Sequence, residues 1–137
     1  MDANEFKLVI LESPFAGPTP AHIQTNLEYA RKAGKECAFR HESILASHLL
    51  FPQFLDDHEP AERELGIGLG LAWRKHAHYS VFYIDLGWSG GMKFALNSAV
   101  NENLPFFVRA FDNKLRLPNS TEDVVEAVVK AFQIIER

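Results

Sequence analysis

The stretch YSVFYIDLGWSGGM, residues 79–92, decides the fold class because its character changes in the middle. Its first part, Tyr79–Leu86, is rich in aromatic and β-branched residues and is followed by a glycine, which predicts a buried strand. Beyond Ser89, apolar residues recur at helical spacing as far as Val100. The stretch therefore predicts a strand that turns directly into a helix through a glycine-rich loop.

Further strands are predicted on both sides of this stretch. The near-continuous apolar run Phe6–Leu11 predicts a buried parallel strand. The segment Glu42–Leu50 fits either a short strand running into a loop or a helical turn. Pro105–Val108 predicts another short strand, and Asn113–Leu117 predicts a last, weak edge strand.

Helices are predicted between these strands. Thr19 and Pro20 are typical of a helix N-cap and first helical residue. The acids before Pro60 favour a helix start, and the helix predicted over 61–76 carries a stripe of Leu65, Leu69, Ala72 and Trp73. We expect its glycines at 66, 68 and 70 to allow close packing against the sheet, a neighbouring subunit or a ligand. Residues 119–123 cap a final helix whose apolar face comprises Val125, Val128, Val129, Phe132 and Ile135.

Strands that alternate with helices predict an α/β domain with a small, mostly parallel sheet of four or five strands and helices on both faces. The 137 residues suit one domain, residues 1–137. In such sheets ligands bind beyond the carboxyl ends of the strands, where the strand order reverses. If the order is the flavodoxin-like 2-1-3-4-5, the loops 12–17 and 85–91 meet at that point.

Composition limits the classes of function. The formal net charge is −4 and there is no long basic cluster, so a nucleic-acid partner is not indicated. The single Cys37 cannot form an intramolecular disulfide, which fits a reducing compartment. The first residues do not resemble a secretory signal, and no apolar run has the length of a membrane span. We expect a cytoplasmic protein without a membrane partner.

Two acids end neighbouring strands of the predicted sheet. Asp85 could hold sugar hydroxyls or a base edge, or it could bind the turn N–H groups of Gly87 and Trp88. Glu12 could face Asp85 across a cleft and share acid and base roles with it, or it could lie in a solvated loop. Both residues are therefore candidate catalytic groups.

Backbone N–H groups at the start of the helix after the glycine loop favour an anion. Ser89, with Gly90 and Gly91, could form such a cradle, or Ser89 could only cap its own helix, as most serines at this position do. This loop is neither a dinucleotide fingerprint nor a P-loop. Trp88 and Phe15 could stack on a base, or pack in the core or against a subunit.

The histidines do not form a recognisable site. Ser47 and His48 are adjacent and follow the possible second strand, where a binding or packing role is expected of them. They cannot act as nucleophile and base, because neighbouring side chains diverge on an extended chain. No ligand spacing predicts a metal site, and no cofactor is predicted.

The motifs ESPFAG, NLEYARKA, SHLLFPQFLDD, ERELGIGLGLAW and YIDLGWSGGM together resemble a family of uncharacterised phage and bacterial proteins related to the nucleoside 2-deoxyribosyltransferase-like superfamily. The resemblance implies a flavodoxin-like, doubly wound three-layer sandwich that is often a homo-oligomer. It also implies a nucleoside or nucleotide site built from the first loop and the glycine loop. The candidate ligand-binding residues are Ser13, Pro14, Phe15, Gly17, Ser47, His48, Gly87, Trp88, Ser89, Gly90, Gly91 and Met92.

The resemblance also implies a reaction. In the transferases a glutamate four residues after a loop glycine attacks C1′ of the sugar and forms a covalent intermediate. When Gly91 is matched to that glycine, Ala95 occupies the place of the glutamate. The hypotheses are therefore an enzyme in which Glu12 replaces the missing carboxylate, a nucleotide-binding module without turnover, and a structural or interaction protein.

Overall fold

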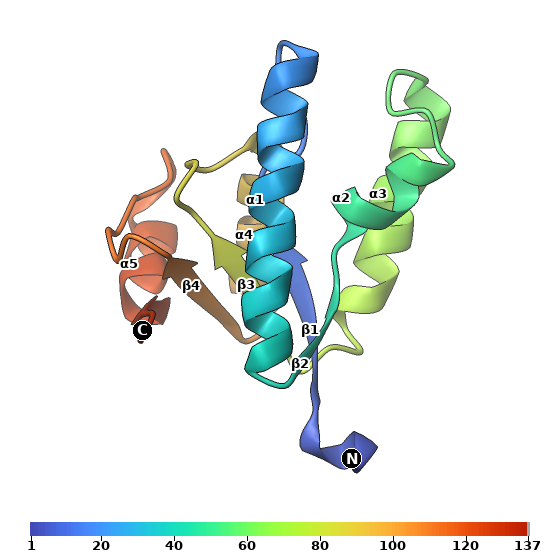
Figure 1. The fold of residues 1–137 in the computed structure, drawn as a ribbon. Helices are drawn as coiled ribbons and strands as arrows, with labels where there is room; N and C mark the ends of the chain where they lie inside the picture. Colours follow the sequence, from blue (N-terminus) through green and yellow to red (C-terminus); the bar gives the residue numbers. More distant parts are fainter. Residues whose placement is uncertain (137) are drawn as a thin grey trace.

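The computed structural model describes residues 1–136 and contains a sheet of five parallel strands (Figure 1). The strands are β1 (Lys7–Glu12), β2 (Glu42–Leu45), β3 (Tyr79–Tyr83), β4 (Phe106–Ala110) and β5 (Phe132–Ile134). Their order is β2-β1-β3-β4-β5, which confirms the doubly wound, flavodoxin-like α/β class. The strand order reverses between β1 and β3, so the loops after these strands leave the same edge of the sheet.

Helices cover both faces of the sheet. They are η1 (Ala3–Glu5), α1 (Pro20–Phe39), α2 (Ser47–Leu50), η2 (Phe51–Gln53), α3 (Pro60–Arg74), α4 (Gly90–Asn101) and α5 (Glu122–Ala131). Figure 1 shows α1 in front of the strands, α4 and α5 behind them, and α2 with α3 to the right. Within residues 1–136 no helix combines the length and apolar character needed to cross a membrane.

Alternation along the strands supplies a separate core for each face. Leu11 and Tyr83 join a cluster under α1 that also contains Cys37, whereas Phe82 and Ile84 join a cluster with buried residues of α4 and α5. Successive strand residues point to opposite faces of the sheet, and the side chains of β3 are buried on both faces. This double burial explains why the strand in the opening stretch is apolar throughout.

The segment Glu42–Leu50, which fitted a strand or a helical turn, contains both in succession: β2 ends at Leu45 and α2 begins at Ser47. The predicted edge strand at Asn113–Leu117 is wrong, because this segment is a loop. Asn113 has a φ of 59°, outside the strand region, and its Oδ1 accepts a 2.9 Å hydrogen bond from the backbone N–H of Ile135. The fifth strand is instead β5, which the sequence placed in the final helix.

Helix α3 departs most from its predicted packing. Its predicted apolar stripe is exposed, and its only residue classed as buried among those described is Arg74. A side chain at Gly66 or Gly70 would meet Leu55 or Ser47, whereas the space around Gly68 is open. The glycines therefore allow contact with the α2–η2 segment rather than close packing against the sheet.

A buried ion pair crosses the face of the sheet under α1. Arg109 of β4 donates from Nη1 and Nη2 to the two carboxylate oxygens of Glu42 of β2, at 2.7 and 2.8 Å. Both side chains are 2% exposed. The hydroxyl of Tyr79 donates a further hydrogen bond of 2.5 Å to Glu42. This pair links β2 to β4 although β1 and β3 lie between them.

Candidate functional site

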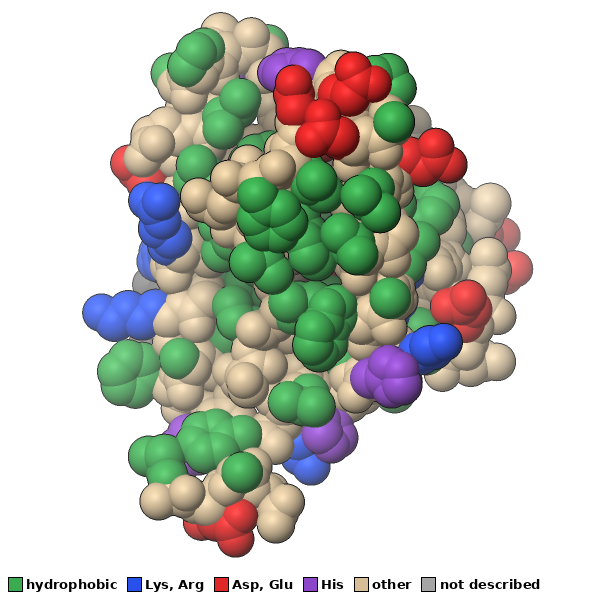
Figure 2. Space-filling view, turned by 90° about the vertical axis from the view of Figure 1, so that its right-hand side faces the viewer, with side chains coloured by type: hydrophobic (Ala, Val, Ile, Leu, Met, Phe, Trp, Pro, Cys, Tyr) green, Lys and Arg blue, Asp and Glu red, His purple; other side chains and the backbone are tan. Residues whose placement is uncertain are grey.

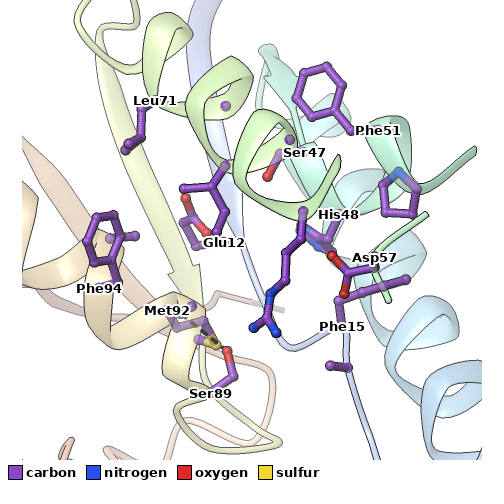
Figure 3. Close-up of a pocket in the computed structure, with 18 of the residues that line it drawn as sticks. Glu12, Phe15, Ser47, His48, Phe51, Asp57, Leu71, Ser89, Met92 and Phe94 are labelled. Atoms are coloured by element: carbon purple, nitrogen blue, oxygen red, sulfur yellow. Dashed lines mark hydrogen bonds between the residues drawn. The ribbon is translucent and has the colours of Figure 1, made fainter. Parts of the chain in front are cut away.

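A cavity of about 590 Å³ opens at the carboxyl end of β1, between α3 and the start of α4 (Figure 3). Its walls come from β1 and the following loop, from α2 and η2, from α3 and from the first turns of α4. The site residues predicted from the sequence that line it are Glu12, Ser13, Phe15, Ser47, His48, Ser89, Gly90, Gly91 and Met92. This is the edge of the sheet at which a doubly wound fold binds its ligands.

Glu12 supplies a carboxyl group to this cavity. It is the last residue of β1, and its side chain points into the cavity beside Phe94 and Met92 (Figure 3). Burial raises the pKa of Glu12 from 4.5 to about 7, and the charge of Arg74 opposes part of that rise. Glu12 is therefore not a solvated loop carboxylate, and near neutral pH it can both give and accept a proton.

Arg74 lies against Glu12 and is a site residue that sequence reasoning missed. Its Nη2 is 3.8 Å from Oε1 of Glu12, which is an ion pair but too long for a hydrogen bond. Its Nη1 is buried and has no hydrogen-bond partner among residues 1–136. Buried guanidinium nitrogens normally have partners, so Arg74 Nη1 is a candidate contact for a group bound in the cavity.

His48 is paired with Ser13 and not with its neighbour in the sequence. Nε2 of His48 lies 2.8 Å from Oγ of Ser13, which joins α2 to the loop after β1. Burial lowers the pKa of His48 to about 4, so the ring is neutral at physiological pH. The neighbour Ser47 also lines the cavity, where it faces Gly70 of α3.

The start of α4 contributes a serine and two glycines. Oγ of Ser89 accepts a 3.2 Å hydrogen bond from the N–H of Met92, so Ser89 caps its own helix, as one of the two sequence interpretations has it. Gly90 and Gly91 line the cavity, and apart from their chain neighbours and the backbone of α4 itself no atom lies within 4 Å of the position that a Cβ would take at either residue. A ligand can therefore approach the backbone of this helix start.

Asp85 does not line the cavity. Its Oδ1 accepts a short hydrogen bond from the Tyr29 hydroxyl and one of 3.0 Å from the N–H of Phe111, and its Oδ2 accepts one of 3.1 Å from the N–H of Asp112. The N–H of Gly87, the partner considered from the sequence, donates to the carbonyl of Ile84 instead. Asp85 thus connects the loop before α4 to α1 and to the end of β4.

Four more predicted ligand-binding residues lie outside the cavity lining: Pro14, Gly17, Gly87 and Trp88. The indole of Trp88 packs on Phe82 in the core, with ring centroids 5.4 Å apart, and donates to the carbonyl of Arg116 at 2.8 Å. Gly87 has a φ of 87°, a conformation that glycine adopts without strain, so its role is in the turn. Pro14 is buried, and Gly17 lies against His22.

The cavity wall contributed by α3 was not predicted. Asp57, Glu62 and Arg63 add charged groups near the start of this helix, and Ile67 and Leu71 add apolar ones. No motif in the sequence indicated which side of α3 faces the site. No group of three or more His, Cys, Asp or Glu side chains able to hold a metal ion occurs in the described part of the chain.

Comparisons with known proteins agree with this architecture. A family model described as a domain of unknown function (DUF7768) matches residues 7–109. No curated protein sequence matches the chain significantly. The solved structure of a 2-deoxyribosyltransferase from the psychrotolerant bacterium Bacillus psychrosaccharolyticus has a TM-score of 0.66 to this fold, with 95% of this chain and 86% of that chain covered at 13% sequence identity. The likeness confirms the fold predicted from the sequence motifs.

Proposed function

We propose that the cavity binds a nucleoside or nucleotide and that Glu12 acts on the N-glycosidic bond of this ligand. The chain belongs to the DUF7768 family and has the fold of a 2-deoxyribosyltransferase. The carrying observation is the Glu12 carboxyl group, which points into the cavity and has a pKa of about 7. The related structure is that of an enzyme described as a biocatalyst for the synthesis of nucleosides, which supports this class of ligand.

The reaction uses the ionised form of Glu12. Its carboxylate attacks C1′ of the sugar directly, or it removes a proton from a water that attacks C1′. In either route a C1′–O bond forms, the C1′–N bond breaks, and the base leaves with the electron pair. In the direct route the base takes its proton from water, and a second water or an acceptor base then breaks the C1′–O bond to Glu12; in the water route Glu12 passes the proton of the attacking water to the base. Arg74 stabilises the ionised carboxylate, because its charge favours that form.

Other groups around the cavity fit the two ends of such a ligand. The N–H groups of Gly90 and Gly91, at the positive end of α4, suit the 5′-hydroxyl or phosphate of the sugar. The ring of Phe15 lines the cavity and suits stacking on the base. Asp85 acts as a positioning residue, because its hydrogen bonds hold the loop that leads into α4.

A second candidate is a nucleotide-binding module without turnover. Ala95 favours it, because this residue lines the cavity at the place where the transferases resembled by the sequence have their glutamate. A methyl group cannot replace a nucleophilic carboxylate. The two candidates therefore differ in one point, which is whether Glu12 replaces the absent glutamate in the reaction at C1′ of the sugar.

The test is to incubate the purified protein with 2′-deoxynucleosides and with nucleoside monophosphates, and to measure free base by chromatography and binding by calorimetry. We expect base release in the native protein, and a decrease of about 100-fold or more in Glu12→Gln with binding retained. Glu64→Gln is the matched control, since Glu64 is exposed on α3 outside the cavity lining. Binding without base release supports the module, and neither binding nor release contradicts both candidates.

The pH dependence gives a second, independent prediction. Because the ionised carboxylate reacts, kcat/KM should rise with pH and level off above about pH 7, the pKa of Glu12. Arg74→Met removes the positive charge that lowers this pKa, so the rise should move to higher pH, whereas Arg74→Lys should move it less. An unchanged midpoint in Arg74→Met would show that another group controls the rate.

A further inference from the structure

Arg74 ends α3 with a positive charge that is turned into the molecule. Figure 2 shows the outer side of α2 and α3, where hydrophobic side chains gather, and the next two residues in the sequence, Lys75 and His76, are exposed. Arg74 is instead buried and belongs to the cavity lining. A buried cation is costly unless it is paired and hydrogen-bonded, so its partners indicate what the site is built for.

The protein compensates only part of this charge. Glu12 is the ion-pair partner of Arg74 within residues 1–136, and its pKa of about 7 leaves it half protonated near neutral pH. Glu62, an acid of α3 that also lines the cavity, lies about 18 Å away along the helix axis, because it precedes Arg74 by 12 residues. Nη1 of Arg74 has no hydrogen-bond partner in the same part of the chain. The guanidinium therefore has both charge and a donor available to a bound ligand.

The reaction proposed above separates charge in a direction that this pair fits. As the C1′–N bond breaks, the sugar gains positive charge and the base gains the electron pair. The carboxylate of Glu12 stabilises the sugar side. A guanidinium directed at the sugar would oppose that positive charge, whereas one directed at the base stabilises the electron pair that the base receives. The pair of Glu12 and Arg74 thus matches the transition state when Arg74 faces the base.

The separation of the two side chains suits this arrangement. An attacking oxygen comes within about 3–3.5 Å of the carbon that it attacks, and the leaving nitrogen is bonded to that carbon. Nη2 of Arg74 is 3.8 Å from Oε1 of Glu12, and Nη1 belongs to the same planar group. A donor so near Glu12 can contact the acceptor atom next to the glycosidic nitrogen of a base bound at C1′.

The acids and donors of the cavity favour one kind of base. Arg74 cannot give up a proton, so it stabilises the base as an anion. Glu12 reacts in its ionised form, and His48 is neutral at physiological pH because its pKa is about 4. A purine that leaves only after protonation on a second ring nitrogen finds no acid among these groups. A pyrimidine carries a carbonyl oxygen, O2, next to the glycosidic nitrogen, and this oxygen shares the charge of the anion.

We infer that Nη1 of Arg74 is a catalytic donor that binds O2 of a pyrimidine base and stabilises the negative charge on that base as the C1′–N bond breaks. The inference rests on the proposed function and names its substrates as pyrimidine nucleosides or nucleotides. Both electrons of the C1′–N bond go to the base, and Arg74 stays protonated throughout. The base takes up its proton afterwards, from water or from Glu12 according to the route.

The first experiment measures base release from 5-fluoro-2′-deoxyuridine, 2′-deoxyuridine and thymidine, whose bases are progressively poorer leaving groups. Each variant is measured at a pH where its rate no longer rises, so that ionisation of Glu12 does not enter. For Arg74→Met we expect a decrease of about 100-fold or more with thymidine, and a decrease at least about tenfold smaller with 5-fluoro-2′-deoxyuridine. Arg74→Lys keeps the charge and should lie between the native protein and Arg74→Met. Lys75→Met is the matched control, since Lys75 is exposed outside the cavity lining.

The outcomes of this experiment separate the inference from the proposed function. Base release by the native protein, with equal decreases for all three substrates in Arg74→Met, would leave the chemistry of Glu12 in place and overturn the role of Arg74 at the base. Release of adenine from 2′-deoxyadenosine as fast as thymine from thymidine would overturn the assignment to pyrimidines.

The second experiment needs no turnover. Calorimetry compares binding of 5-nitrouracil, which is an anion at neutral pH, with binding of uracil, which is neutral there. The native protein should bind the anion at least about tenfold more tightly, Arg74→Met should lose this preference, and Lys75→Met should keep it. Circular dichroism checks that the variants are folded. The preference without base release would support the contact between Arg74 and the base and contradict only the reaction at C1′, whereas no preference in the native protein would overturn the inference.

Discussion

Arg109→Met is expected to lower the free energy of unfolding by about 3–5 kcal/mol. The substitution leaves the carboxylate of Glu42, which is 2% exposed, without the guanidinium that occupies both of its oxygens. The hydroxyl of Tyr79 would still donate to this carboxylate, but the remaining cation, Arg40, is 39% exposed and its Nε is 3.9 Å from Oε1 of Glu42, too far for a hydrogen bond. Urea denaturation at neutral pH measures the change.

We attribute this loss to a buried carboxylate that has lost its hydrogen-bonded cation, and not to a large net stabilisation by the ion pair itself. Replacing both partners, as in Arg109→Met with Glu42→Leu, should therefore recover most of the lost stability. The exposed pair of Lys130 and Glu126, 3.0 Å apart on α5, serves as the control, and Lys130→Met should change stability by less than about 0.5 kcal/mol. A double variant as unstable as the sum of the single ones would disprove this explanation.

This ion pair also illustrates what the sequence could not predict about the fold. The order of strands and helices followed from local patterns, because the apolar runs and the Thr19–Pro20 helix start are local signals. Glu42 and Arg109 lie on strands that are not neighbours. Their contact depends on the strand order and on which face each side chain points to, and no local pattern contains that information.

The position of the candidate site was predicted from the sequence, but part of its lining was not. Glu12 and the start of α4 were found, because the switch point of a doubly wound sheet brings their loops together whatever their exact conformations. Arg74 was missed because it is distant in sequence, at the end of a helix whose orientation depends on tertiary packing. Trp88 and Asp85 lie in the loop that leads to Gly90, yet the Trp88 ring packs in the core and the Asp85 carboxylate binds the chain just after β4. A loop can therefore be located from the sequence while the direction of each side chain cannot.

Glu12→Gln is expected to stabilise the protein above about pH 7, by about 3 kcal/mol at most. The pKa of Glu12 is about 7 in the folded state, against an ordinary 4.5, so the folded state holds the proton more tightly. Stability must then fall as pH rises through this window, because the unfolded chain loses its proton first. Glutamine carries no charge and avoids this loss, as expected if Glu12 is kept for function at a cost in stability.

His48 changes stability with pH in the opposite direction to Glu12. Its pKa is about 4 in the folded state against an ordinary 6.5, so its contribution is present above about pH 6.5 and is lost as pH falls toward 4. Between about pH 4.5 and 6.5 the contributions of Glu12 and His48 to the pH dependence of stability should therefore nearly cancel, since the two pKa shifts have similar size and opposite effect on stability. The free energy of unfolding of the native chain should depend only weakly on pH in this range, although each of the two residues alone would give a strong dependence.

Single variants should separate the two slopes. In Glu12→Gln, stability relative to the native chain should increase as pH is raised from about 4.5 to 7, which leaves the slope of His48 visible. In His48→Gln the slope of Glu12 should remain, and in the double variant both should vanish. Denaturant unfolding at several pH values measures these differences, with Glu64→Gln as the exposed control. A difference between Glu12→Gln and the native chain that is constant with pH would mean that Glu12 has an ordinary pKa. The predicted rise of kcat/KM up to about pH 7 could then not come from Glu12.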